Sequence, residues 1–179
     1  MAIDEEAIIG FLDETSPQTT SNTQRLWSLN KPMIYKNTSI YKANTFGFYA
    51  LNGVSVVEHM EYSKKEDVCA FLDCIRNANP RGKIAIVLDN FRSHRANATL
   101  EHAIKLNIEL VFLPTYSPDL NPIEYIWKSI KRVVSSTFIE DLEHLRAVIV
   151  QSFTMFSKRL SFAKSWIEKF LGRRLSINS

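Results

Sequence analysis

The sequence predicts an α/β domain with a mixed five-stranded sheet, three antiparallel strands plus two parallel ones, flanked by helices. Three observations predict it: strand-like segments separated by turn formers early in the chain, helical and strand-like segments that alternate in the middle, and a last third that is helical throughout. At 179 residues, 45% of them hydrophobic, the chain is long enough to form one compact domain with a buried core.

The first three strands are expected at residues 7–14, 24–30 and 45–53. Each segment is rich in aromatic or β-favouring residues, as in "TFGFYALNG", and turn formers lie between them. Strands separated in this way are typical of antiparallel hairpins.

A helix is expected at 64–78, where apolar residues recur at helical spacing until "NPRG" ends the pattern. The continuous apolar run "KIAIVLD", residues 83–89, is typical of a strand that is covered on both faces. A helix at 93–107 and a strand at 108–114 repeat the alternation. The two strands that this helix connects should therefore be parallel.

From Asn121 onward the pattern is helical. It contains two apolar stripes that a further set of aromatic residues extends, and these faces are expected to cover the sheet. The first stripe consists of Ile123, Ile126, Trp127, Ile130, Val133 and Val134, the second of Leu142, Leu145, Val148, Ile149, Phe153 and Phe156, and the extension of Phe162, Trp166 and Phe170.

Three acidic residues are notable for their positions in this scaffold. Asp13 is expected at the end of the first strand, Asp89 at the end of the fourth, and Glu124 on the first turn of the helix after the fifth. Sites in open α/β sheets form beyond the carboxyl ends of strands. Clustered carboxylates suit hard divalent cations, and two such ions can organise phosphodiester chemistry.

Each acid alone also has a purely structural interpretation. Asp13 could begin a turn in "DETSPQ", and Asp89 with Asn90 could cap the following helix. Glu124 could belong to an N-x-x-E capping arrangement that starts at Asn121. Only the conjunction of all three positions favours a metal cluster.

Two segments carry a resemblance to a known family. "VLDNFRSH" and "LPTYSPDLNPIEYIWKSIKR" resemble the catalytic core of Tc/mariner superfamily transposases, in particular the bacterial and archaeal insertion-sequence branch with a DDE triad. Thirty-four residues separate Asp89 from Glu124 (124 − 89 − 1), as in that superfamily. "FLDETSPQ" resembles its first-Asp segment, and Arg25, Trp27 and Pro32 also fit its pattern, so the resemblance covers most of residues 8–134.

The resemblance implies an RNase H-like fold in which Asp13, Asp89 and Glu124 are catalytic and bind two Mg²⁺ or Mn²⁺ ions per active site. It implies hydrolytic cleavage of DNA at the terminal inverted repeats of a transposon. The freed 3′-hydroxyl would then attack target DNA. The rigid "SPDLNP" turn would aim Glu124 toward the other two acids.

Further residues are candidates for supporting roles. Asn90 and His94 lie where the family commonly shows an Asn and a His, and His94 could position water, phosphate or a carboxylate or be purely structural. Lys128 and Lys131 lie four and seven residues after Glu124, on the same helix face.

We predict that Lys128, Lys131 and Arg132 bind DNA phosphates. A salt bridge between Glu124 and Lys128 is the alternative. Charge is consistent with a DNA-facing C-terminal third: residues 125–179 hold ten Lys and Arg against four Asp and Glu, hence +6, whereas residues 1–124 hold twelve against fifteen, hence −3.

The chain is expected to be a single catalytic domain over 1–179, with a core at about 1–134 and C-terminal helices at 135–179. Family members carry N-terminal helix-turn-helix modules, and we expect that domain to be absent here and to be supplied by a partner segment. A homodimer on DNA is expected because transposition joins two element ends. Two other functions remain open, another two-metal nuclease on this fold or a catalytically silent transposase fragment that acts as an interaction module.

The sequence predicts no membrane association, because it has no signal peptide pattern and no run of eighteen apolar residues. We expect a cytoplasmic, prokaryotic protein associated with the nucleoid. Cys69 and Cys74 lie five residues apart on one predicted helix, a spacing that suits neither a metal site nor a disulfide framework.

Overall fold

The computed structural model describes residues 7–19, 37–115 and 117–172. The expected strand at 24–30, together with Arg25, Trp27 and Pro32, lies outside these residues. The elements follow in the order β1 (Ile8–Thr15), β2 (Thr45–Ala50), β3 (Val56–His59), α1 (Lys65–Ala78), β4 (Ile84–Leu88), α2 (Asn97–Lys105), β5 (Ile108–Phe112), η1 (Pro118–Leu120), α3 (Ile123–Ser136), α4 (Leu142–Phe156), η2 (Leu160–Ala163) and α5 (Lys164–Phe170).

The five strands form one mixed sheet in the order β3-β2-β1-β4-β5. β1 pairs antiparallel with β2, and β2 with β3, whereas β4 pairs parallel with both β1 and β5. The predicted mixed sheet is confirmed. Its third antiparallel strand is Val56–His59, which we did not predict, because four residues ending in Glu58 and His59 are too short and too polar to show a clear pattern.

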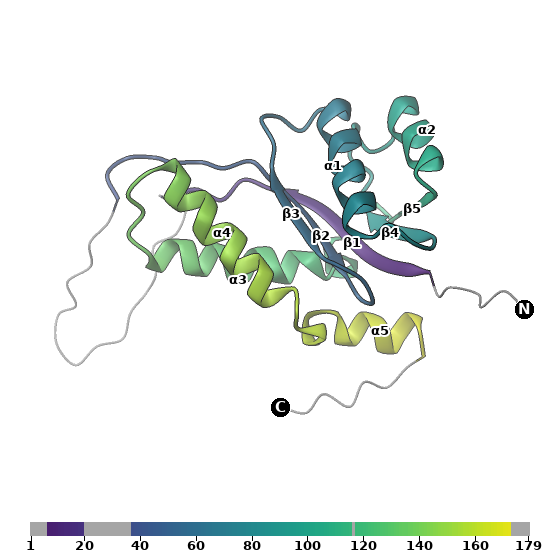
Figure 1. Cartoon of the computed structure of the whole chain (residues 1–179). Coiled ribbons are helices and arrows are strands. Elements are labelled where there is room, and N and C mark those ends of the chain that lie inside the picture. The colour runs from purple at the N-terminus through teal and green to yellow at the C-terminus, as the bar shows by residue number, and fades with distance from the viewer. Residues whose placement is uncertain (1–6, 20–36, 116, 173–179) are drawn as a thin grey trace, which may run out of the picture.

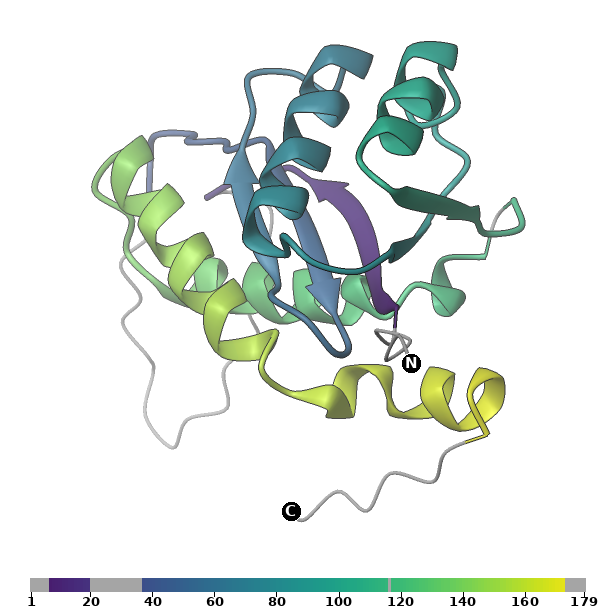
Figure 2. The ribbon, with the colours of Figure 1, turned by 45° about the vertical axis from the view of Figure 1, so that its right-hand side comes forward.

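Helices cover both faces of the sheet. α1 and α2 lie on one face, and α3, α4 and α5 lie on the other (Figure 1, Figure 2). Because side chains alternate along a strand, Phe11 of β1 packs with the α3 side and its neighbour Leu12 packs with the α1 side. The result is two separate cores, one on each face.

The expected helical stripes are confirmed. Ile123, Ile126, Trp127 and Ile130 are buried on α3, and the segment after α4 completes the same core, with the ring of Trp166 edge-on to Phe11 at 4.9 Å between centroids. In the described part of the chain, none of the helices has both the length and the apolar character needed to cross a membrane.

Gly47 allows α3 to lie close to the sheet. It is the antiparallel partner of Asp13, and the ring of Trp127 lies directly over it. A Cβ atom at Gly47 would lie 2.5 Å from Cζ2 of Trp127 and 2.9 Å from Cε2 of Phe153. Any side chain at position 47 would therefore push α3, and Glu124 with it, away from Asp13.

We expect Gly47→Ala to lower the free energy of unfolding by about 1–3 kcal/mol, the usual cost of overpacking a core. Urea denaturation followed by circular dichroism measures the loss. The double variant Gly47→Ala, Trp127→Phe has a smaller ring and should recover part of the stability. A double variant whose loss is the sum of the two single losses would contradict this explanation.

Candidate active site

The pairing of β1 with β4 brings Asp13 and Asp89 side by side. The two parallel strands are in register from Ile8 opposite Ile84 to Phe11 opposite Val87. Asp13 lies on β1 two residues after Phe11, and Asp89 lies two residues after Val87, directly beyond the end of β4. The period of two puts both on the α3 face. Asp13 pairs with β2, and β1 continues beyond it to Thr15. Contrary to expectation, Asp13 therefore does not end the strand, and the alternative that it begins a turn is wrong.

Asn121 anchors the start of α3 to β1. Its side chain is 3% exposed, and its amide donates a long hydrogen bond of 3.5 Å to the carbonyl of Leu12, next to Asp13. The alternative of an N-x-x-E capping arrangement is wrong, because α3 begins at Ile123 with Pro122 as its N-cap and no side chain caps it. The carboxylate of Glu124 is consequently not engaged with the helix start, although it is carried to the predicted place.

All three predicted acids line one pocket of about 530 Å³. It lies beyond the carboxyl ends of β4 and β5, beside the first turn of α3. The structure thus brings together residues that are as many as 111 positions apart (124 − 13). The pocket is lined by Asp13, Asp89, Asn90, Phe91, Leu113, Pro114, Thr115, Ser117, Asn121 and Glu124.

Burial and neighbouring negative charge raise the proton affinity of two of the three carboxylates, Asp13 and Glu124. Burial, then the negative charges of Glu124 and Asp89, raise the pKa of Asp13 to about 7, although a hydrogen bond from the backbone of Glu14 acts against this. Burial and the charge of Asp89 also raise the pKa of Glu124, whereas the nearby charge of Lys131 lowers it. Such a concentration of negative charge favours a proton or a cation.

Asp89 is oriented by two donors. Its Oδ1 accepts a hydrogen bond of 3.0 Å from the backbone of Phe91 and one of 2.8 Å from Nδ1 of His94. The bond from His94 lowers the pKa of Asp89, against the effect of partial burial. The alternative that Asp89 and Asn90 cap the next helix is wrong, because α2 begins at Asn97 with Ala96 as its N-cap.

His94 bridges two carboxylates. It is 1% exposed, and Nε2 lies 2.9 Å from Oε1 of Glu14. Burial alone would lower the pKa of His94, but its hydrogen bonds to Asp89 and Glu14 and their charges raise it to about 9, so the ring is a cation at neutral pH. These contacts are the ones that a role in positioning a carboxylate requires.

Glu14 was not predicted. Its neighbour Asp13 faces α3, so alternation along β1 sends Glu14 to the opposite face, where the loop before α2 carries His94. This alternation is the sequence signal from which the position of Glu14 could have been predicted. Asn90 also has a bridging contact, because its amide donates to the carbonyl of Leu113 and links the segments after β4 and β5.

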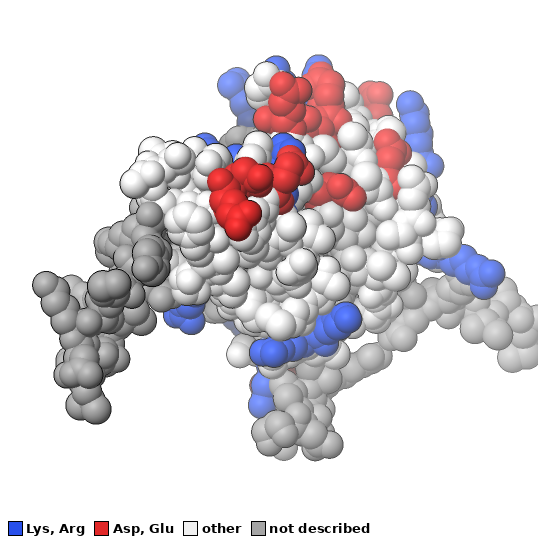
Figure 3. Space-filling view, turned by 60° about the vertical axis from the view of Figure 1, so that its left-hand side comes forward, with Lys and Arg blue, Asp and Glu red and all other residues white. Residues whose placement is uncertain are grey.

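The three predicted DNA-binding residues do not share one surface. Lys131 lies near enough to Glu124 to influence its pKa, whereas Lys128 and Arg132 line a second cavity. Glu124 and Lys128, both in the described part of α3, form no salt bridge. On the face shown in Figure 3, Lys and Arg side chains are scattered rather than gathered into one basic surface.

Within residues 7–19, 37–115 and 117–172, no three His, Cys, Asp or Glu side chains are arranged closely enough to hold one metal ion. The donor chemistry of the pocket nevertheless fits a hard cation. Besides three carboxylates, it contains Oδ1 of Asn121, which is buried and has no hydrogen-bond partner. Carboxylate and amide oxygens are the ligands that Mg²⁺ and Mn²⁺ prefer.

A family model described as "DDE superfamily endonuclease" matches residues 9–146, which include all three acids of the pocket. The chain belongs to this family. No curated protein matches the chain.

Solved structures of Mos1 transposase are similar to the chain. The mariner Mos1 paired-end complex with Mg has 20% identity and a TM-score of 0.65 over 82% of this chain and 48% of that one. The Mos1 catalytic domain with raltegravir and Mg has 19% identity and a TM-score of 0.62 over 82% and 70%. The pre-cleavage Mos1 transpososome has 17% identity and a TM-score of 0.62 over 86% of this chain and 54% of that one.

These similarities show that the fold is RNase H-like, as predicted, with the mixed sheet of the Mos1 catalytic domain. The chain spans about half the length of the Mos1 transposase chains in the transpososome and paired-end complexes. At these identities the likeness concerns the fold alone.

Proposed function

We propose that this chain is the catalytic domain of a Tc/mariner-type transposase, which cleaves DNA at transposon ends and joins the 3′-hydroxyl to target DNA. The observation that carries the proposal is the convergence of Asp13, Asp89 and Glu124 on one pocket within a DDE-family domain. Mos1, whose fold is similar, forms paired-end complexes with transposon ends and has been solved with Mg and Mn.

Asp13, Asp89 and Glu124 would hold Mg²⁺ or Mn²⁺ in the pocket, and Asn121 would offer a further oxygen. When bound, such ions activate an attacking oxygen and stabilise the leaving oxygen of a phosphodiester. Asp13 must lose its proton to serve as a ligand, and its pKa of about 7 makes that step easy at slightly alkaline pH.

The remaining residues of the site orient these groups. His94 fixes one oxygen of Asp89, and Asn90 holds the carbonyl of Leu113 at the rim of the pocket. The contact between Asn121 and Leu12 sets the position of Glu124. Lys131, close to Glu124, supplies positive charge for a phosphate that approaches the pocket.

A cleavage assay tests the proposal. Purified chain is incubated with Mg²⁺ or Mn²⁺ and one of four labelled substrates: duplexes bearing the element's terminal repeats, scrambled duplexes, RNA–DNA hybrids and four-way junctions. We expect metal-dependent nicks in the DNA duplexes, and not in the hybrid or the junction. Preferential cleavage of the hybrid or the junction would indicate the other two-metal nucleases instead.

A catalytically silent interaction module is the second candidate. It is favoured by one observation, namely that no three acidic or histidine side chains in the described part of the chain are arranged to hold one ion. Isothermal titration with Mn²⁺ separates the two functions. The transposase proposal requires binding that Glu124→Gln weakens, and absence of binding at millimolar Mn²⁺ would favour the module.

A further inference from the structure

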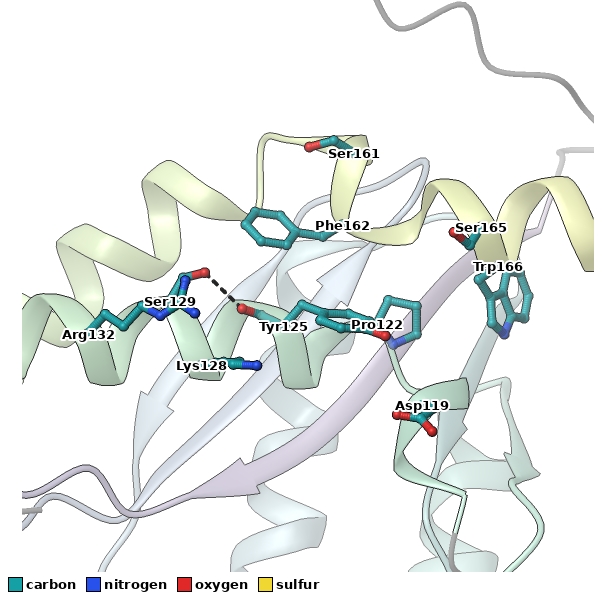
Figure 4. Close-up of a pocket in the computed structure, with 10 residues that line it drawn as sticks. All are labelled: Asp119, Pro122, Tyr125, Lys128, Ser129, Arg132, Ser161, Phe162, Ser165 and Trp166. Carbon is teal, nitrogen blue, oxygen red and sulfur yellow. Dashed lines mark hydrogen bonds between the residues drawn. The ribbon is translucent and has the colours of Figure 1, made fainter. Parts of the chain in front are cut away.

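A second cavity, of about 440 Å³, lies between α3 and the segment formed by η2 and α5. We call it the α3–α5 groove. Figure 4 shows residues of α3 along one wall and Phe162, Ser165 and Trp166 along the other. Its lining consists of Asp119, Pro122, Tyr125, Lys128, Ser129, Arg132, Ser161, Phe162, Ser165 and Trp166.

The chemistry of the groove suits a nucleotide. Lys128 and Arg132 are exposed cations one helical turn apart on the α3 wall, so they can contact phosphates of one strand. Tyr125 is 47% exposed and presents an aromatic surface on which a base can stack. The lining carries two cations against one carboxylate, that of Asp119, so its charge favours an anion.

The size of the groove limits what can enter it. A volume of about 440 Å³ is at the small end of the range for ligand pockets. A DNA duplex is too bulky for such a cavity and could only lie across its rim, where its phosphates could meet Lys128 and Arg132 but its paired bases could not stack on Tyr125. An unpaired nucleotide could use both kinds of contact.

The groove also adjoins the acidic pocket. Residues just before α3 and on its first turn alternate between the two: Asn121 and Glu124 line the pocket, whereas Pro122 and Tyr125 line the groove. Only the thickness of this helix, about 10 Å, separates the two cavities. A strand cut in the pocket could therefore extend over the start of α3 into the groove.

We propose that the α3–α5 groove binds an unpaired segment of a DNA strand next to the site of cleavage, with Lys128 and Arg132 on its phosphates and Tyr125 stacked on a base. The inference rests on the proposed function, because it takes DNA as the substrate. It adds that the substrate is locally single-stranded on the α5 side of α3.

Binding without cleavage tests this. Fluorescence anisotropy in EDTA compares a labelled twelve-nucleotide single strand with the duplex of the same sequence. We expect the single strand to bind more tightly. Lys128→Ala with Arg132→Ala should weaken its binding by at least about tenfold and lower the slope of log K against log salt by about 1.4, since each phosphate contact contributes about 0.7.

The aromatic contact needs its own variants. Tyr125→Ala should weaken single-strand binding about five- to a hundredfold and leave duplex binding unchanged, whereas Tyr125→Phe should bind as the parent does. Lys105→Ala, an exposed cation on α2 across the sheet, is the matched control and should have no effect. Melting curves establish that each variant is folded.

Two results would overturn the proposal. One is a folded set of groove variants that bind the single strand as the parent does. The other is an unchanged affinity together with a smaller molar mass by light scattering for Tyr125→Ala, which would make the groove an interface between copies of the chain. Both measurements are made in EDTA, without metal, so their results do not depend on whether the chain cleaves DNA.

Discussion

Asp13→Asn should abolish metal-dependent cleavage and at the same time stabilise the metal-free chain above pH 7. Asparagine cannot supply the charged oxygen that a hard cation needs, so we expect the cleavage rate to fall at least about a hundredfold. It also removes a carboxyl group that burial and the charges of Glu124 and Asp89 make costly to ionise. Stability and activity should therefore change in opposite directions.

The pH dependence follows from the raised pKa. The pKa of Asp13 is near the usual 3.8 in the unfolded chain but about 7 in the folded chain. The folded metal-free chain therefore binds more protons between these pH values and loses stability as pH rises through them. Asp13→Asn should lack this loss. Its free energy of unfolding should exceed that of the parent by on the order of 1–3 kcal/mol above pH 7, and the difference should vanish below pH 4.

Urea denaturation in EDTA across that pH range measures the difference, and thermal melting with added Mn²⁺ measures metal binding. Mn²⁺ should raise the melting temperature of the parent more at pH 8 than at pH 6, and should not raise that of the variant. Glu101→Gln, an exposed carboxylate on α2, is the control. If Asp13→Asn destabilised the folded chain at pH 8, the electrostatic account of the pocket would be wrong.

His94→Ala should be the most destabilising substitution near the site. It leaves Glu14, whose side chain is 13% exposed, without its partner, and a stranded buried charge costs about 3 kcal/mol or more. Asp89 also loses the donor that orients it, so we expect cleavage to fall about 10- to 100-fold. Denaturation at pH 7 and cleavage rates measure the two effects.

A second substitution separates positioning from stability. His94→Ala with Glu14→Gln removes the stranded charge and should regain much of the stability, but the cleavage rate should stay low because Asp89 still lacks its donor. A rate that recovers together with stability would show that His94 acts only through folding. His102→Ala is the matched control, since the pair of His102 with Asp73 is partly exposed to solvent and should contribute less than about 1 kcal/mol.

The same bridge predicts the alkaline limit of stability. The pKa of His94 is raised from 6.5 to about 9 in the folded chain, so its contribution is fully present below pH 6.5 and is lost as pH rises through 9. Together with Asp13, this makes the metal-free chain less stable at alkaline pH, and a bound cation would offset part of that loss.

The sequence was sufficient for four of the five strands, all except β3, and for the meeting of the three acids. Continuous apolar runs reveal buried strands such as Ile84–Leu88, and the carboxyl ends of parallel strands necessarily lie at one edge of the sheet. The rigid turn before α3 was also predicted to aim Glu124 at this edge. The prediction of the strands and that of the place of Glu124 both depend on local sequence patterns, and the tertiary contacts of the fold agree with these patterns.

The features that were missed depend on partners remote in sequence. Asn121 reads as a helix cap from its neighbours, but the carbonyl of Leu12, 109 positions away, takes its amide. Likewise, residues 93–96 have helical character but form the loop that buries His94 between Glu14 and Asp89. Local propensity cannot report a contact whose second member is fixed only by the fold.

Asp13 lies on β1 and Asp89 directly follows the adjacent strand β4, and backbone pairing fixes such strands about 4.8 Å apart whatever side chains surround them. Glu124 has no such constraint, because its position depends on the short turn before α3 and on how α3 packs against the sheet. Variation in the spacing of the acids among related chains should therefore arise from the helix and not from the sheet. Engineering a different ion preference would accordingly begin with the residues beneath α3.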